Sequence, residues 1–173
     1  MTSLDDSFSH VAGLERRFIE AAYFRDAYRV PLRNARAGMT EIFHAIFAHH
    51  PLWMKSVLIL RNLLVRCVGL GGASASDILH PQYRRRYAVG DRLGVWPILA
   101  LTDTALVVGR DDKHLDFRLT LLKRTEEGAA HVLISTSCVV HNRFGKIYLF
   151  FVVPFHGWGV RKIIGNAIRA GRI

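Results

Sequence analysis

The feature that most constrains the fold is an uncharged stretch near the C-terminus. Over Ile147–Val160 no residue carries a charge, and most side chains are aromatic or branched aliphatic. Basic residues flank it, with Arg143 and Lys146 before it and Arg161 and Lys162 after it. So much apolar area requires an apolar partner surface. The stretch is shorter than the roughly 20 residues of a membrane span, so we expect a helix of the fold and no transmembrane segment.

This stretch belongs to a long C-terminal helix in our interpretation. The helix is predicted to begin near Asn142 or Arg143 and to continue to the end of the chain. Pro154 is expected to kink it, because proline removes one helical hydrogen bond. Gly157 and Gly159 are expected to weaken it locally.

Upstream of the helix, four stretches have strand patterns separated by turn residues. They are Asp91–Ala100, Thr104–Gly109, His114–Arg124 and Ala130–His141. Pro97 lies inside the first and indicates an edge strand or a bulge. The sequence Glu126-Glu127-Gly128 between the last two is a hairpin signal. Short turns between consecutive strands predict an antiparallel meander.

The first part of the chain is expected to contain one strand and mostly helices. Residues 1–22 are predicted to be a helical N-terminal extension, and Tyr23–Leu32 is predicted to be a strand. A helix then begins with Thr40 as its N-cap and ends before Pro51. A second helix is predicted at Leu52–Val68, followed by a Gly/Ser/Ala loop at 69–81.

The order of these elements predicts an α+β fold of the helix-grip type. In this fold, a curved antiparallel sheet wraps around a long C-terminal helix, and two short helices follow the first strand. Residues 23–173 are expected to form one domain, with a cavity between sheet and helix. With 173 residues, half of them hydrophobic, the chain is long enough to bury a full core.

Several segments resemble a known family. They are Gly90-Asp91-Arg92-Leu93-Gly94, Asp112-Lys113-His114-Leu115-Asp116-Phe117-Arg118, His141-Asn142-Arg143-Phe144-Gly145-Lys146-Ile147-Tyr148, Pro154-Phe155-His156 and Val160-Arg161-Lys162-Ile163-Ile164. Together they resemble the uncharacterised bacterial family called domain of unknown function 2867, over roughly Tyr23 to Ala170. The resemblance implies the START-like, birch-allergen-like helix-grip (SRPBCC) superfamily and a cavity. It implies no activity and no catalytic residues.

Composition limits the classes of partner. The net charge of +10 favours contact with phosphates, anionic lipid head groups or acidic partners. No nucleic-acid motif is visible and aromatic residues do not alternate with basic ones, so we expect no nucleic-acid binding. Cys67 and Cys138 are far apart, which predicts neither a disulfide nor a metal site. We expect no cofactor, no signal peptide and a cytoplasmic location.

Asp112, His114 and Asp116 are the first candidate for chemistry. Strand alternation places them on one face, where they can bind a metal or let a carboxylate orient His114 as a general base. Alternatively, they form a solvated outer face, because the apolar side chains of this strand are expected to face the cavity. We favour the solvated face and predict no metal site.

His156 is the second candidate, because it follows Pro154 within the uncharged stretch. It can face the cavity as an anchor for a ligand carbonyl or hydroxyl, or act as an acid or base. Alternatively, it hydrogen-bonds a carbonyl freed by Pro154. His141 and Asn142, at the junction of strand and helix, are expected to cap or turn the chain. The residues expected to line the ligand site are Phe117, Leu119, Thr136, Cys138, Tyr148, Phe151, Phe155 and His156.

Three functions follow from this interpretation, in order of preference. The first is non-catalytic binding of a hydrophobic small molecule, such as a lipid or a polyketide-like compound, between sheet and helix. The second is an enzyme of the cyclase or dehydratase type that uses His156 or His114. The third is peripheral membrane association through the basic C-terminal helix and the arginines at 84–86. The oligomeric state is not predicted.

Overall fold

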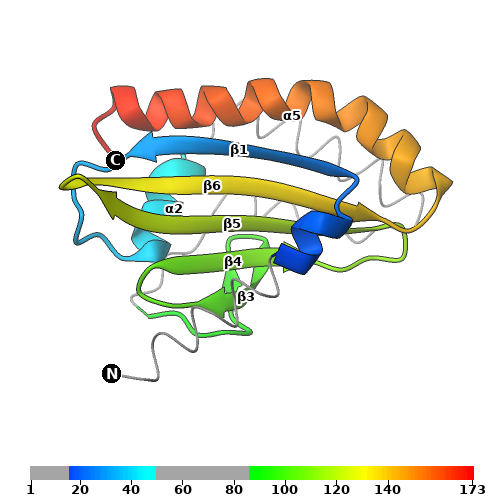
Figure 1. Ribbon diagram of the computed structural model, residues 1–173, viewed down its shortest axis with the longest axis horizontal. Helices are drawn as coiled ribbons and strands as arrows, with labels where there is room; N and C mark the ends of the chain where they lie inside the picture. Colours follow the sequence, from blue (N-terminus) through cyan, green and yellow to red (C-terminus); the bar gives the residue numbers. More distant parts are fainter. Residues whose placement is uncertain (1–15, 50–85) are drawn as a thin grey trace.

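The computed structural model describes residues 16–49 and 86–173, and residues 16–21 are helical. Eight further elements follow in these ranges (Figure 1). They are β1 (Phe24–Pro31), α2 (Met39–Phe47), β2 (Arg92–Leu93), β3 (Trp96–Leu101), β4 (Ala105–Arg110), β5 (Leu115–Glu126), β6 (Ala129–Val140) and α5 (Arg143–Arg169).

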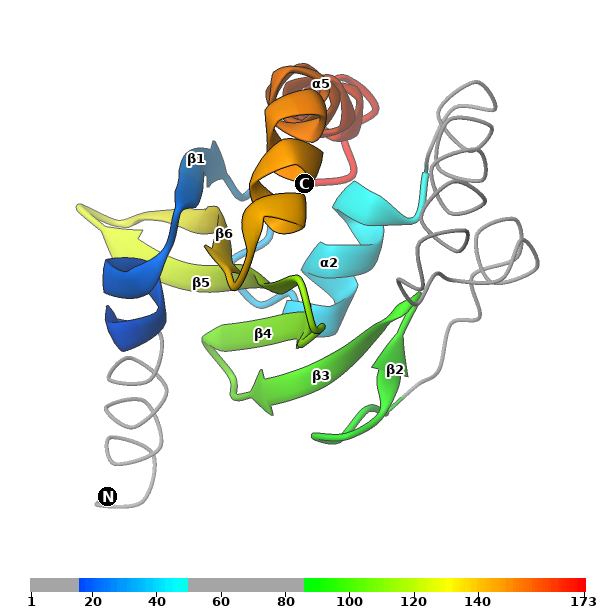
Figure 2. The same ribbon diagram turned by 90° about the vertical axis from the view of Figure 1, so that its right-hand side faces the viewer.

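The strands form one antiparallel sheet in the order β1-β6-β5-β4-β3-β2. Figure 2 shows that the sheet curves around α2 and that α5 lies across the open side of the curve. The predicted α+β class is therefore confirmed, and the arrangement is consistent with a helix-grip fold. Because β1 pairs with β6, the first and last strands lie side by side beneath α5 (Figure 1).

The meander follows the sequence pattern closely, with one difference. The predicted strand Asp91–Ala100 is divided into β2 and β3 by a tight turn at Gly94, whose φ is 62°. A residue in the left-handed conformation at this position allows a two-residue hairpin loop, and glycine adopts this conformation without a steric cost. The bulge expected from Pro97 is present as a register shift between Ile98 and Ala100.

The hairpin between β5 and β6 is also confirmed. Glu127 and Gly128 form its two-residue loop, with φ values of 51° and 80°. Positive φ at both central residues matches the right-handed twist of the two strands, which pair along their whole length.

Helix α2 begins two residues earlier than the sequence indicates. Gly38 is its N-cap, and its N–H donates to the Glu41 carboxylate at 3.3 Å. The prediction of Thr40 as the N-cap is therefore wrong, because Glu41 satisfies the backbone at the start of the helix. The predicted helix Leu52–Val68 and the loop at 69–81 lie outside the described residues.

Helix α5 begins where it was predicted and continues through Pro154 to Arg169. Figure 1 shows it as one curved helix. Asn142 is its N-cap and accepts the Gly145 N–H at 3.1 Å, which confirms the capping role expected for this residue.

The core lies between the curved sheet and the two helices. Its largest fully buried side chains come from α2 and from the strands, and include Ile42, Ile46, Leu106, Leu121 and Ile134. Helix α5 buries residues near its two ends only. These are Gly145 and Leu149 in the first half, and Val160, Ile163, Ile164 and Ala167 in the second half. The middle of α5, which includes His156, is half-buried or exposed.

Candidate functional site

Polar side chains gather on the helix-facing side of β1 and β6. Asp26 on β1 pairs in register with Thr136 on β6, and Phe24 pairs with Cys138. Side chains alternate between the two faces of a strand, so these residues share their face with Val30 of the core. A carboxylate on an otherwise apolar sheet face needs a partner.

The partner of Asp26 is His156 of α5. Their closest atoms, Oδ2 of Asp26 and Nε2 of His156, are 3.3 Å apart, and the side chains are only 18% and 22% exposed. The Tyr28 hydroxyl donates to the same carboxylate oxygen at 3.0 Å. The buried Oδ1 of Asp26 has no hydrogen-bond partner among the described residues. Nε2 of His156 is also buried and makes no hydrogen bond within the described part of the chain, so the pair is a close contact with unused hydrogen-bonding capacity on both side chains.

The charge of Asp26 is maintained at neutral pH. Burial alone raises the pKa of its carboxyl group, but contact with His156 and its charge, together with the Tyr28 and Thr136 hydroxyls, outweigh burial and hold the pKa below its ordinary value. The pKa of the Tyr28 hydroxyl shifts in the opposite direction, because burial and the neighbouring Asp26 raise it. Tyr28 therefore remains a hydrogen-bond donor.

Cys138 lies beside this group but is not a nucleophile at neutral pH. Burial, and then the charge of Asp26, raise the pKa of its thiol to about 12. A thiol attacks only as its thiolate. Cys138 is therefore a small buried side chain of the site.

Aromatic groups complete the surroundings of His156. The ring of Phe24 contacts the imidazole edge-on, with centroids 5.6 Å apart. The Arg161 guanidinium lies over the Tyr28 ring, 5.9 Å from its centroid. An ionised carboxylate and an imidazole among aromatic rings can orient a hydroxyl, carbonyl or amine of an apolar molecule, or transfer a proton to it.

The structure places the predicted ligand-site residues in two different locations. Leu119, Thr136 and Cys138 are buried on the helix-facing side of the sheet. Phe117 shares that face, packs against Trp96 with centroids 5.7 Å apart, and is half-buried. Tyr148 is half-buried on α5.

Phe151 and Phe155 do not lie in the interior. Both side chains are exposed on the outer side of α5. The expectation that they line a cavity is wrong in this respect, because an uncharged helix does not reveal from its composition which of its sides faces the sheet.

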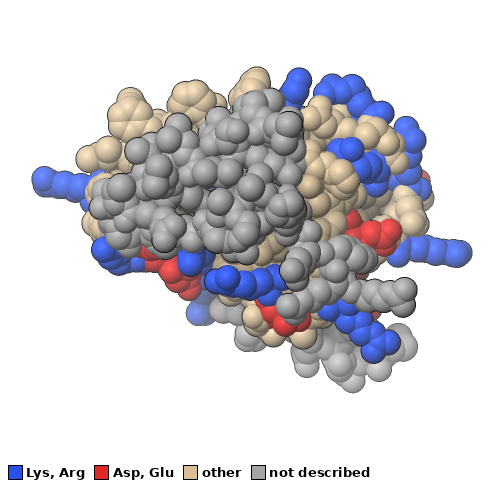
Figure 3. Space-filling view, turned by 180° about the vertical axis from the view of Figure 1, so that it is seen from behind, with Lys and Arg blue, Asp and Glu red and all other residues tan. Residues whose placement is uncertain are grey.

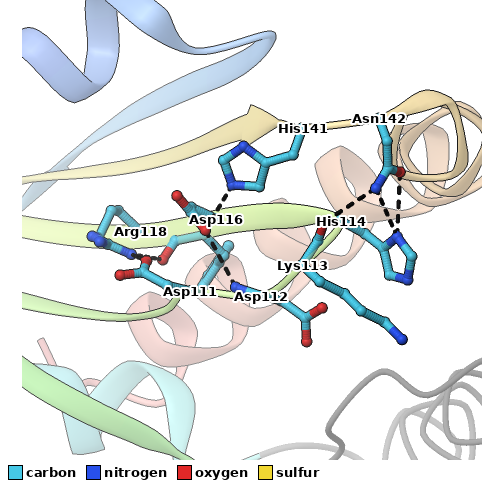
Figure 4. Close-up of polar contacts among 9 residues, drawn as sticks. Asp111, Asp112, Lys113, His114, Asp116, Arg118, His141 and Asn142 are labelled. Carbon is cyan, nitrogen blue, oxygen red and sulfur yellow. Dashed lines mark hydrogen bonds and ion pairs between the residues drawn. The ribbon is translucent and has the colours of Figure 1, made fainter.

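The side chains of His114 and Asp116 contact different partners (Figure 4). Asp116 pairs with His141, with Oδ1 and Nε2 3.0 Å apart, and accepts the Asp112 N–H at 3.2 Å. Asp116 is opposite Val139 in register, which places it on the face away from α5. Among the described residues, no group of three or more His, Cys, Asp or Glu side chains is arranged to hold a metal ion.

His114 instead supports the start of α5. The Asn142 amide donates to the Lys113 carbonyl at 3.1 Å, and Nδ1 of His114 lies 2.9 Å from Nδ2 and 3.2 Å from Oδ1 of the same amide, so the tautomer of His114 decides which atom it bonds. The His114 ring packs against Phe144 with centroids 4.7 Å apart. Nearby, Arg118 pairs with Asp111 (Figure 4). This cluster joins the end of β6 and the start of β5 to the helix, which favours a structural role.

Asp26 and Tyr28 are functional candidates that sequence reasoning missed. The strand Phe24–Pro31 alternates between a helix-facing set, Phe24, Asp26, Tyr28 and Val30, and an outer set that contains Arg25 and Arg29. An acidic residue within the apolar set was the available signal. Its partner His156 is distant in sequence, so only the pairing of β1 with β6 beneath α5 brings the two together.

A family model described as "Protein of unknown function (DUF2867)" matches residues 18–163. No curated protein and no solved structure is significantly similar to the chain.

Proposed function

The chain belongs to this DUF2867 family of proteins of unknown function, and we propose that it binds a hydrophobic small molecule, lipid-like or polyketide-like, between its sheet and α5. The observation that carries this proposal is the half-buried Asp26–His156 pair with one unsatisfied carboxylate oxygen. The sheet-and-helix layout also supports placement in the helix-grip superfamily, which forms part of the proposal.

The site offers one polar anchor on an apolar surface. The ionised Asp26 can accept a hydrogen bond from a ligand hydroxyl or amine, and His156 can form a hydrogen bond with a ligand carbonyl or hydroxyl. Phe24 and Phe117, both half-buried, supply apolar contact. An amphipathic ligand with one polar end fits this arrangement better than a fully polar one.

The test is ligand uptake with matched variants. Native mass spectrometry of the purified protein, and titration with fatty acids, sterols and polycyclic aromatic compounds, should show binding with one molecule per chain. Asp26→Asn and His156→Gln should each weaken binding by about 10- to 100-fold, the contribution of a hydrogen bond to a charged group. Absence of uptake across the whole panel contradicts the proposal.

A second Asp–His pair in the same protein provides the control. Asp116 and His141 also meet within 3.0 Å, but on the opposite face of the sheet. Asp116→Asn should therefore leave ligand affinity unchanged. An equal loss of affinity in both variants indicates a general effect on folding and contradicts the assignment of the site.

The Asp26–His156 pair also favours a second candidate, an acid–base enzyme of the dehydratase or cyclase type. With a β-hydroxy carbonyl compound, His156 would take the proton from the carbon next to the carbonyl and then give it to the departing hydroxyl. The products are the unsaturated carbonyl compound and water, and Asp26 would stabilise the imidazolium between the two steps.

This candidate makes its own prediction. His156→Gln should lower turnover of β-hydroxyacyl thioesters at least 100-fold, measured by the ultraviolet absorbance of the unsaturated product. Binding of the same compounds without any turnover in the wild type supports the carrier and contradicts the enzyme.

A further inference from the structure

The outer side of α5 carries an exposed apolar stripe. It consists of residues three or four positions apart, which we call the aromatic stripe: Ile147, Phe150, Phe151, Pro154, Phe155 and Trp158. Its large side chains are 55–75% exposed, from Trp158 to Phe150. A contiguous exposed apolar surface of this kind on a folded protein marks an interaction site.

The stripe has no role in the core. An α-helix advances 100° per residue, which places the aromatic stripe on the side of α5 opposite Leu149, Ile163 and Ala167. Those three residues are buried. The helix thus has two apolar sides, and the fold buries one of them.

Charge gives the second observation. Helix α5 contains no acidic residue. Five cationic residues lie before and after the aromatic stripe along the helix: Arg143, Lys146, Arg161, Lys162 and Arg169. The upper edge of the molecule in Figure 3, along which α5 runs, shows projecting uncharged side chains with Lys and Arg side chains to either side and no acidic group.

We propose that the aromatic stripe is a docking surface for an anionic lipid bilayer, on which α5 lies parallel to the membrane. Helices of this kind insert aromatic and aliphatic side chains at the boundary of head groups and acyl chains, and their Lys and Arg side chains contact anionic head groups. Trp158 is suited to this boundary because its ring is amphipathic.

A surface position fits better than a transmembrane one. By length and composition α5 could cross a membrane. Its core side, however, is buried with Ile42 and Ile46 of α2 in one hydrophobic cluster. Crossing a bilayer would expose this cluster, whereas lying on the bilayer leaves it intact.

Co-sedimentation with vesicles tests the proposal. The wild-type chain should bind vesicles of phosphatidylcholine and phosphatidylglycerol, and bind vesicles of phosphatidylcholine alone more weakly. Phe150→Ala/Phe155→Ala should weaken binding at least tenfold, because both side chains would leave the lipid. Val89→Ala, which removes an exposed apolar side chain outside α5, should leave binding unchanged.

The charges are tested with a matched pair of variants. Arg143→Gln/Lys162→Gln should weaken binding to anionic vesicles by roughly 30-fold, from about 1 kcal/mol for each cation. Arg25→Gln/Arg124→Gln changes the net charge equally, but both residues lie on the sheet face away from α5. This control should bind almost as well as the wild type, and high salt should weaken binding of both.

Three results overturn the proposal. The first is absence of binding to anionic vesicles. The second is equal loss of binding in the two charge variants. The third is a wild-type dimer in analytical ultracentrifugation that Phe150→Ala/Phe155→Ala converts to a monomer, which assigns the stripe to a second copy of the chain. His156→Gln should retain vesicle binding, so failure of the ligand proposal does not affect this test.

Discussion

Substitution of Gly145 by alanine tests how α5 is held on the sheet. Gly145 is the third residue of the helix, and a Cβ atom there would lie 2.4 Å from the His114 carbonyl oxygen and 2.9 Å from Cγ1 of Val140. The first contact is with backbone, so a rotamer change cannot relieve it. Alanine should therefore force the start of α5 away from β5 and β6.

The expected cost can be estimated from general values. Overpacking of a well-packed site costs about 1–3 kcal/mol, and the better helix propensity of alanine offsets at most about 1 kcal/mol. We expect Gly145→Ala to lower the free energy of unfolding by about 1–2 kcal/mol. For a chain of this size, that corresponds to a fall in Tm of about 2–8 °C.

Gly159 of the same helix provides the control. No atom of the described residues lies within 4 Å of a Cβ built there, so only helix propensity changes. Gly159→Ala should raise the free energy of unfolding by up to about 1 kcal/mol. Denaturant unfolding and calorimetry measure both variants. A Gly145→Ala protein as stable as the wild type would refute the close contact between α5 and the start of β5.

Three further predictions concern single groups. The pKa of Asp26 is lowered on folding, so its contribution to stability is complete above the ordinary carboxyl pKa of 3.8 and is lost as the pH falls through the folded value. In urea unfolding at a series of acidic pH values, the free energy of unfolding should therefore depend less on pH for Asp26→Asn than for the wild type. In a Cys67→Ser background, Cys138 should react with a disulfide reagent only after unfolding, and rapid reaction of the native protein at neutral pH would contradict its raised pKa. Glu127 has a φ of 51°, and Glu127→Asn should raise the free energy of unfolding by about 0.5–1 kcal/mol in denaturant titrations, because Asn-Gly suits this hairpin loop; a less stable variant would argue against the turn.

Much of the fold follows from local patterns in the sequence. Alternation and turn residues locate β4, β5 and β6 to within one or two residues, because each turn has its own chemistry. The same reasoning places the start of α5 at its Asn142 cap. It missed the turn at Gly94 because the flanking residues remain apolar there, and a glycine inside an apolar stretch is also compatible with a bulge.

The candidate site could be predicted only in part. His156 was identified because it is the one histidine in an uncharged stretch, but nothing local connects it to Asp26. That contact depends on the pairing of β1 with β6, which joins strands far apart in the sequence. His114 and Asp116 show the converse. Their spacing is compatible with a shared site. In the structure, however, His114 contacts Asn142 at the cap of α5, whereas Asp116 pairs with His141.

The two sides of α5 explain why one stretch of sequence supports two proposals. The absence of charge over Ile147–Val160 requires an apolar environment, but that environment can be a protein core, a bound ligand or a lipid surface. Leu149 is buried in the fold, His156 meets Asp26 at the sheet, and Phe150 and Phe155 point outward. Because the two candidate surfaces lie on opposite sides of one helix, a His156 variant should change ligand binding alone. The outer phenylalanine variants should change vesicle binding alone, and a variant on one side that abolished both activities would mean that the two surfaces act as one site.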